Sequence, residues 1–375
     1  MDLSIRPVSD ENELTQFIMF PWACYQDDPY WVAPMVSERS ARLNRKINQY
    51  WRSNVSRKWI AWRGSQPVGT ILAAAPTRAE RGSIGTFGFF ECLDDPEAAA
   101  ALLQTAGAWV KERGLKKICG PYNPSPTDEP GILVDGFETR PAIMTGHNPP
   151  LYQSLIESAG FTKREDLVAR LTTLPPNAKE AAEIMPPRLA EVAERAGRRP
   201  DLVVRRFNPR AYNSEIQTAW SIYNTALAPV PGFTPIPWEE FRAMAEGFRP
   251  FLDPNLALVA EVGGNPAGFI LLLPDMNEAL HAARGGQGLF GRLRFLLRRL
   301  RLTRVSFKIL VILPEYQGRG IEAVLINQAA RAIVRRGFRE VDMSLTGEDN
   351  VKSTLFQERL GMNIYRRYRI YQKRL

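Results

Sequence analysis

The residues best suited to chemistry in this 375-residue chain lie in a short turn between a predicted strand and a predicted helix. Residues 305–313 form an apolar run, and apolar residues at helical spacing follow from Ile321 onward. The turn contains Gly318 and Gly320, which let an anion approach the backbone, and Arg319, which adds a positive charge. The start of a helix offers unpaired N–H groups and a positive dipole end. The sequence therefore predicts a phosphate-binding site here.

This turn resembles the acyl-CoA pyrophosphate loop of the GNAT acyltransferase superfamily. The family pattern is Gln or Arg, two residues, Gly, one residue, and then Gly or Ala, and Gln317 and Gly320 match it. Glu322 stands at the last position, where the family has a small residue. The resemblance implies acetyl-CoA or another acyl-CoA as co-substrate. It assigns cofactor contacts to the strand end and the turn, at Ile312, Leu313, Gln317, Gly318, Arg319, Gly320 and Ile321.

Asn350 is a further cofactor contact that the resemblance implies. In GNAT folds an Asn two or three residues before the next helix often contacts the cofactor, and Asn350 occupies the matching position. The alternative is that its side chain caps a helix starting at Val351, because Asn is favoured at the N-cap.

The catalytic residues are less clearly marked. GNAT enzymes transfer an acyl group from CoA to an amine that must lose a proton, and an acid helps the thiolate to leave. The family's usual acid is a Tyr, but Gln357 occupies that position, and an amide has no proton to give at neutral pH. Ser344 and Tyr316 are therefore candidate catalytic residues, and Tyr365 is another possible substitute. Ser344 belongs to an alternating strand and shares one face with Asp342 and Thr346. This face either borders a cleft between the two units or is a solvated face of the sheet.

Two loops are candidates for the acceptor site. Residues 123–129 form a polar, proline-containing loop in which Glu129 or Asp128 can deprotonate an amine or hold a cationic acceptor. A solvated turn is the alternative. Residues 230–238 are rich in proline, and the family resemblance places this connection over the acceptor; alternatively it is only a stiff link.

The chain contains a weak internal repeat. Residues 106–120 align with residues 329–343 at a constant offset, and each segment reads as a helix ending in basic residues and Gly, followed by a strand. Residues 155–161 and 356–362 both resemble a helix end of GNAT domains. We therefore predict an α/β (α+β) fold of two tandem GNAT-like units, each a mixed twisted sheet flanked by helices. Two unrelated α/β domains are the alternative.

The two predicted units span residues 1–174 and 202–375, and a linker rich in proline and charge occupies residues 175–201. The repeat aligns the phosphate-binding turn with residues 94–97 (DDPE) of the first unit. Carboxylates and a proline there replace the N–H donors and the positive charge that a diphosphate needs. We predict that the first unit is a degenerate GNAT-like domain and that the second is the acyltransferase domain.

The resemblance extends beyond the turn. The chain is similar to an uncharacterised bacterial group of tandem GNAT-like proteins at residues 88–91, 120–125, 133–137 and 368–371. This similarity covers nearly the full length. It supports the fold and says little about the substrate.

Composition restricts the partners. The net charge of +9 favours anionic partners such as CoA, nucleic acid or anionic lipid. The N-terminus lacks an apolar segment of the signal-peptide kind, and no apolar run is long enough to span a bilayer, so we expect a cytoplasmic protein. Three separated cysteines read as reduced thiols, and with two histidines they indicate no metal site.

Residues 274–304 form an insertion where ordinary GNAT domains have a tight hairpin. Within it, residues 289–301 place six apolar side chains on one helical face and arginines mostly elsewhere around the helix. Such a basic amphipathic helix can contact an anionic membrane or cover a long acyl chain. Packing against the protein's own core is the alternative.

The predicted function is that of an N-acyltransferase, which moves an acetyl or other acyl group from acyl-CoA to an amine of a small molecule or peptide. One alternative is a protein that binds CoA or acyl-CoA without turnover, because of Gln357 and Glu322. Another is a Fem-type transferase that takes an aminoacyl group from tRNA. The intact turn from Gln317 to Gly320 favours CoA, so we do not expect a nucleic-acid partner.

Overall fold

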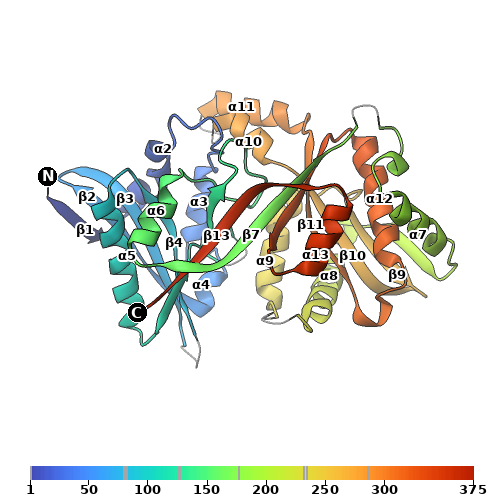
Figure 1. Cartoon of the computed structure of the whole chain (residues 1–375), viewed down its shortest axis with the longest axis horizontal. Coiled ribbons are helices and arrows are strands. Elements are labelled where there is room, and N and C mark those ends of the chain that lie inside the picture. Colours follow the sequence, from blue (N-terminus) through green and yellow to red (C-terminus); the bar gives the residue numbers. More distant parts are fainter. Residues whose placement is uncertain are drawn as a thin grey trace.

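The computed structural model describes residues 2–78, 83–125, 128–175, 178–230, 233, 235–284 and 288–375, and for Ala182, Ser344 and Lys352 the backbone alone. The chain forms two α/β halves that lie side by side (Figure 1), and both termini lie in the N-terminal half. In the described ranges, no helix combines the length and the apolar character needed to cross a bilayer.

The N-terminal half packs α5 and α6 against its strands. Its elements are β1 (Leu3–Pro7), α1 (Glu11–Met19), α2 (Pro21–Cys24), α3 (Val36–Leu43), α4 (Tyr50–Ser53), β2 (Asn54–Arg63), β3 (Gln66–Pro76), β4 (Gly85–Cys92), α5 (Pro96–Lys111), β5 (Lys117–Gly120), β6 (Ile132–Asp135), α6 (Leu151–Ser158) and β7 (Thr162–Thr173). Asp95 caps α5 by accepting a hydrogen bond from the Ala98 N–H, and Pro96 occupies the first turn, which explains why the helix starts there.

The C-terminal half repeats this plan and adds two helices, α10 and α11, between β10 and β11. Its elements are η1 (Ala181–Glu183), α7 (Pro187–Gly197), β8 (Leu202–Arg206), η2 (Pro209–Ala211), α8 (Tyr212–Leu227), α9 (Trp238–Phe248), η3 (Arg249–Phe251), β9 (Ala257–Val262), β10 (Asn265–Pro274), α10 (Asn277–Ala283), α11 (Gly288–Arg299), β11 (Arg304–Ile312), η5 (Pro314–Tyr316), α12 (Ile321–Arg336), β12 (Glu340–Gly347), α13 (Val351–Arg359) and β13 (Asn363–Arg374). The predicted strand, turn and helix of residues 305–337 are confirmed.

One mixed sheet runs through both halves. Its strand order is β1-β2-β3-β4-β5-β13-β7-β12-β11-β10-β9-β8, and β6 pairs with β13 beside this path. Among the described strands, neighbours are antiparallel except for β4 with β5 and β11 with β12, which are parallel. The predicted α/β class, with a mixed sheet flanked by helices, is confirmed.

Strands β7 and β13 connect the two halves. β13 comes from the end of the chain but pairs with β5 and β6 of the N-terminal half as well as with β7. β7 in turn pairs with β12 of the C-terminal half. Figure 1 shows both strands crossing the middle of the molecule. Hydrogen bonds therefore join residues 1–174 to residues 202–375 along two strands, and the domain boundaries stay a prediction.

Each half has its own hydrophobic core. In the N-terminal half the core includes Tyr371 of β13, which is fully buried and donates its hydroxyl to Glu157 (2.8 Å). In the C-terminal half, α12 packs on one face of the sheet and α8 on the other. The N-terminal core is therefore completed by the last strand of the chain.

Candidate functional site

The parallel strands β11 and β12 separate part-way along their length. Their described pairing ends with Phe307 opposite Met343, whereas β11 continues to Ile312 and β12 to Gly347. On its other side β12 is irregular at the same level, because its register with β7 shifts after Met343. We call the opening between the two strands beyond this point the strand gap.

The edge of β11 that faces the strand gap can pair with a ligand. The Leu313 N–H donates to the Ala267 carbonyl oxygen of β10 (2.8 Å), so the amide of Leu313 is directed into the sheet. Because backbone groups alternate in direction along a strand, Leu310 and Ile312 direct theirs toward the gap. The side-chain amide of Gln317 donates to the Ile312 carbonyl oxygen there (3.0 Å). An extended ligand in the gap therefore meets backbone groups of β11.

The turn after β11 leads directly into α12. Gln317, Gly318 and Arg319 are exposed, while Gly320 and Ile321 are buried. Both glycines have positive φ (73° and 77°), a conformation that favours glycine. The first N–H groups of α12 have no partner within the helix, and the positive end of its dipole lies beside the exposed turn. The turn has the backbone conformation expected of a phosphate site, and cofactor contacts at these residues remain a prediction.

Gly320 also has a structural reason to be glycine. A Cβ at this position would lie 2.9 Å from the Ala196 Cβ and 3.2 Å from the Val192 Cγ1 of α7. A larger residue would push α7 away from the start of α12. By contrast, Arg319 is exposed, and its guanidinium carbon lies 5.4 Å from the centre of the Tyr316 ring. A substitution at Arg319 can therefore change the charge of the turn without disturbing the packing of α7 against α12.

The corresponding opening in the N-terminal half is filled by the chain itself. The parallel pairing of β4 with β5 ends with Thr86 opposite Cys119. Beyond that level the Tyr122 N–H donates to the Phe87 carbonyl oxygen (2.8 Å). A Cβ at Gly88 would lie 1.6 Å from the Tyr122 carbonyl oxygen, so the two segments are in tight contact. Residues after β5 thus occupy the edge of β4 that a ligand would need.

The turn that precedes α5 uses its carboxylates internally. Asp95 accepts two hydrogen bonds from Arg63 (2.9 Å each) in addition to capping the helix. Glu97 pairs with the same guanidinium. Both carboxylates are paired with the Arg63 guanidinium, and they would repel a diphosphate. This supports the prediction that the first unit has no acyl-CoA site of this kind.

Asn350 and Gln357 both have structural roles. Asn350 accepts a hydrogen bond from the Ser353 N–H (3.1 Å) and so caps α13, while a cofactor contact remains a prediction. The buried Gln357 accepts from Arg170 (3.1 Å) and donates to the Thr346 hydroxyl (2.9 Å). Gln357 therefore ties α13 to β7 and β12 and supplies no acid.

Catalytic roles are predicted for Tyr316, Ser344 and Glu129, and no described contact joins these three residues. Tyr316 lies beside Arg319 and packs against the C-terminal core. The backbone of Ser344 belongs to β12, but its side chain lies outside the described part of the chain. Glu129 belongs to the N-terminal half, where it forms an ion pair with Arg42 (2.9 Å). Their catalytic roles stay a prediction.

Glu129 lines a cavity of about 580 Å³ to which both halves contribute. Burial would raise its pKa, but the charge of Arg42 and a hydrogen bond from Asn123 (3.2 Å) outweigh burial and hold the pKa below its usual value. A carboxylate with a lowered pKa is a weak base, so this environment suits cation binding better than proton abstraction.

The predicted acceptor loops are described in part. Residues 126 and 127 of the first loop lie outside the described residues, as do residues 231, 232 and 234 of the second. In the second loop Ile236 lines the 580 Å³ cavity, as does Glu129 of the first. Both loops thus border one cavity.

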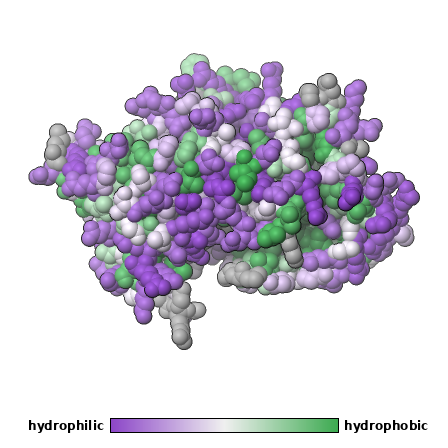
Figure 2. Space-filling view, viewed as in Figure 1, coloured by the Kyte–Doolittle hydropathy of each residue, from purple (hydrophilic) through white to green (hydrophobic). Residues whose placement is uncertain are grey.

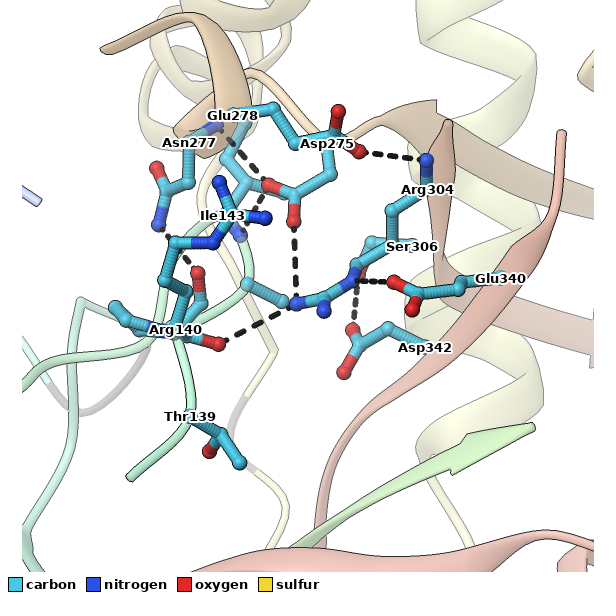
Figure 3. Close-up of polar contacts among 12 residues, drawn as sticks. Thr139, Arg140, Ile143, Asp275, Asn277, Glu278, Arg304, Ser306, Glu340 and Asp342 are labelled. Atoms are coloured by element: carbon cyan, nitrogen blue, oxygen red, sulfur yellow. Dashed lines mark hydrogen bonds and ion pairs between the residues drawn. The ribbon is translucent and has the colours of Figure 1, made fainter. Parts of the chain in front are cut away.

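A buried hydrogen-bonded cluster closes the base of the strand gap (Figure 3). The Ser306 hydroxyl donates to one oxygen of Asp342 (2.5 Å). The Tyr365 hydroxyl donates to the other oxygen (2.7 Å). Ser306 and Asp342 are fully buried. Burial and the Asp342 charge raise the pKa of Tyr365, so it keeps its proton at neutral pH. The cluster holds β11 and β12 together at the point where they begin to separate.

A second part of this network joins the insertion and the N-terminal half to β11 (Figure 3). Arg304 donates to Glu340 (2.8 Å), and its guanidinium lies 3.7 Å from Asp275. Asp275 also accepts a hydrogen bond from the Ile143 N–H (2.9 Å). Burial, opposed by Arg304 and reinforced by the charge of Asp342, raises the pKa of Asp275 to about 7. Sequence reasoning missed Asp275, because nothing local marks it as buried.

Lys308 is a titratable residue on β11 at the level of the strand gap. Its ammonium donates to the Ile143 carbonyl oxygen (2.8 Å). Burial lowers the pKa of Lys308, although the charges of Asp342 and Asp275 oppose this. Together with Leu345, it lines a second cavity. The signal for Lys308 in the sequence was a charged residue inside the apolar run of residues 305–313.

The second cavity has a volume of about 490 Å³ and lies between α8, α9 and the sheet. Its lining is mainly aromatic and aliphatic, and includes Tyr223, Phe241 and Phe269. The two cavities adjoin, because they share lining residues at Met144, Thr145, Met244 and Phe248. Both volumes lie within the range of about 300–1,000 Å³ that is typical of small-molecule sites.

Comparisons with known proteins agree with this geometry. The sequence model of the Acetyltransferase (GNAT) family matches residues 219–362. The chain is 32% identical to Protein YghO of Escherichia coli (strain K12), over 99% of this chain and 95% of that protein. It is 30% identical to the bacterial ceramide synthase of Caulobacter vibrioides (strain NA1000 / CB15N), over 100% of this chain and 98% of that protein. The chain belongs to the GNAT acetyltransferase family.

Solved structures share the fold of this GNAT protein. A tandem GNAT protein from the clavulanic acid biosynthesis pathway aligns with a TM-score of 0.60 at 11% identity, covering 100% of this chain and 98% of that one. A probable N-acyltransferase from Enterococcus faecalis V583 aligns with a TM-score of 0.53 at 8% identity, covering 100% and 73%. The predicted tandem of GNAT-like units is confirmed. Proteins of this fold bind acyl-CoA.

The raised pKa of Asp275 makes the stability of this GNAT protein depend on pH. Between pH values near 4 and about 7, the native state binds more protons at Asp275 than the unfolded state does. The contribution of Asp275 to the free energy of unfolding should therefore fall as the pH rises, by roughly 1–3 kcal/mol. Asp275→Asn should remove this fall. We expect chemical denaturation to show wild-type protein losing stability relative to the variant between pH 5 and pH 8. A relative gain would show that Asp275 is ionised and ion-paired throughout.

Proposed function

We propose that this protein is an N-acyltransferase that uses a fatty acyl-CoA to acylate the amine of a long-chain lipid. The observation that supports it most directly is the position of the strand gap. The gap lies between the exposed turn at residues 317–319 and the apolar cavity of about 490 Å³. Acyl-CoA matches this arrangement, because it carries a diphosphate at one end and an acyl thioester at the other.

In this proposal the donor lies along β11. Its diphosphate contacts the first N–H groups of α12, with Arg319 as an additional cation. Its pantetheine arm pairs with the backbone groups of Leu310 and Ile312 in the strand gap. The thioester then reaches the level of Lys308, which lies further along β11 toward the base of the gap.

The apolar cavity supports a long-chain acceptor in this proposal. Side chains such as Tyr223, Phe241 and Phe269 provide an environment that favours hydrocarbon over water. The Caulobacter relative is named as a ceramide synthase, and a ceramide is the amide of a fatty acid with a long-chain amino alcohol. We therefore favour a long-chain amino alcohol over a peptide amine, and a fatty acyl group over acetyl.

Lys308 fits the role of the group that accepts the proton of the amine. The amine nitrogen attacks the thioester carbonyl carbon, the C–S bond breaks, and CoA leaves as a thiolate. Because burial lowers its pKa, Lys308 loses its proton more readily than an exposed lysine. In its neutral form, Lys308 can take the proton that the attacking amine must lose and return it to the thiolate, so the protons balance.

A protein that binds acyl-CoA without turnover is the second candidate. Gln357 favours it, because this amide replaces the family's usual acid and is hydrogen-bonded on both sides. Thiol release separates the two candidates. Binding of a fatty acyl-CoA without thiol release in the presence of long-chain amines would favour the second.

Thiol release from a fatty acyl-CoA in the presence of a long-chain amino alcohol should be lost in Lys308→Met. We expect kcat to fall by about 10²–10⁴-fold, which is the usual contribution of a positioned base. Lys308→Arg keeps the charge but cannot lose its proton at neutral pH, so it should be equally inactive. The assay follows thiol by absorbance and the amide by mass spectrometry. Full activity of Lys308→Arg would show that Lys308 only positions other groups.

Arg319→Glu should weaken the binding of CoA at least tenfold at low salt, because it places a negative charge beside the diphosphate. The loss should shrink as salt increases. Arg331→Glu is the matched control, because Arg331 is an exposed arginine further along α12. Isothermal titration calorimetry with CoA measures both variants. An equal effect in the two variants, or none in Arg319→Glu, would contradict the assignment of the turn.

A further inference from the structure

The insertion between β10 and β11 presents an apolar helix face to solvent. α11 and the residue after it expose large apolar side chains at Leu289 (81% exposed), Phe290 (80%), Leu293 (51%), Leu296 (56%), Leu297 (59%) and Leu300 (82%). Figure 2 shows hydrophobic residues at the upper edge of the molecule, where Figure 1 places α11. Packing against the protein's own core does not account for this face. A contiguous apolar patch of this kind marks an interaction surface.

The same segment is strongly basic. Between Glu278 and Glu315 the sequence contains seven arginines and no acidic residue. Arg292, Arg294 and Arg301 are exposed in or next to α11. The exposed apolar side chains are therefore flanked by positive charge, which complements an anionic surface.

α11 is fixed to the body of the protein by arginines of its last turn. The Arg298 guanidinium pairs with the buried Glu278 (2.7 Å), and Glu278 also accepts a hydrogen bond from the Arg304 N–H (2.7 Å). Arg299 donates to the Pro250 carbonyl oxygen (2.6 Å). These bonds hold the helix so that its apolar face points away from the protein.

The helix also borders the cavity that both halves line. Phe295 of α11, Leu280 of α10 and Met276 all contribute to the lining of the 580 Å³ cavity. This cavity adjoins the apolar cavity beside the strand gap, as their shared lining residues show. A surface bound to α11 therefore borders the first of two neighbouring cavities, and Lys308 lines the second.

We propose that α11 docks this protein on an anionic membrane surface. Its apolar side chains enter the boundary between headgroups and acyl chains, and the arginines contact lipid phosphates. A second copy of this chain fits less well, because a symmetric contact would bring rows of arginines together. This proposal rests on the proposed function only in explaining what the docking is for, namely the delivery of a long-chain amine. The docking itself needs neither CoA nor turnover.

Co-sedimentation of the full-length protein with vesicles tests this docking. We expect binding to vesicles containing phosphatidylglycerol, at least tenfold weaker binding to pure phosphatidylcholine, and weaker binding as salt increases. The triple variant Leu289→Ser, Phe290→Ser, Leu300→Ser should lose at least tenfold in affinity for the anionic vesicles. The matched control is Val351→Ser with Leu355→Ser, because these side chains are exposed on α13 (62% and 47%). It should bind like wild type.

Two results would overturn the proposal. One is a wild-type protein that does not bind the anionic vesicles. The other is a triple variant that stays folded by circular dichroism and binds them as well as wild type does. If the vesicles are not bound and light scattering shows a wild-type dimer that the triple variant lacks, the face belongs to a second copy of the chain. None of these results depends on whether the protein releases thiol, so the docking proposal and the proposed function can fail separately.

Discussion

The separation of β11 from β12 after Phe307 and Met343 is the constraint on which the site depends. Neighbouring strands usually stay paired, because an unpaired backbone group must find another partner. Here the cluster of Ser306, Asp342 and Tyr365 holds the strands together up to that level. The register shift of β12 against β7 accompanies their separation beyond it. Beyond that level the edge of β11, beside the start of α12, is left to side chains such as Gln317, to water or to a ligand.

The two halves of the chain share a plan but differ at this point. In the N-terminal half the segment after β5 lies against β4, and the Tyr122 N–H takes the Phe87 carbonyl oxygen that an open edge would offer. Asp95 and Glu97 are paired with Arg63 where the other half has an exposed turn with a cation. The edge of β4 is covered by a main-chain segment, whereas at the edge of β11 the described bond to the Ile312 carbonyl oxygen comes from the Gln317 side chain. This difference explains how one fold, used twice, provides one candidate site.

The parts of the fold that depend on local pattern could be predicted from the sequence. The strand, turn and helix of residues 305–337 follow from apolar spacing and from glycines at 320 and 337, which the structure shows in left-handed conformations at the two ends of the helix. The pairing of β13 with β5 could not be predicted, because it joins residues that lie far apart in the chain. Asp275 was missed for the same reason, since its burial and its partner Arg304 exist only in the folded protein.

The amphipathic helix shows a different limit. Its spacing of apolar and basic residues fits both a helix packed on the core and a helix on a membrane, and the sequence does not distinguish them. The exposure of Leu289 and Leu300 excludes the first arrangement for that face. Gln357 is a similar case. Its position in the sequence indicated only that the family's usual catalytic acid is absent, whereas its hydrogen bonds to Arg170 and Thr346 show that it ties α13 to the sheet.

Hydrogen exchange with and without CoA tests the central claim most directly, because it reports on the backbone edge itself. If the strand gap holds the pantetheine arm, CoA should slow hydrogen exchange at the amides of Leu310 and Ile312 and in the first turn of α12. The exchange rates of the β4 amides should stay unchanged. Unchanged exchange in β11 at saturating CoA, or protection in β4 instead, would contradict the account.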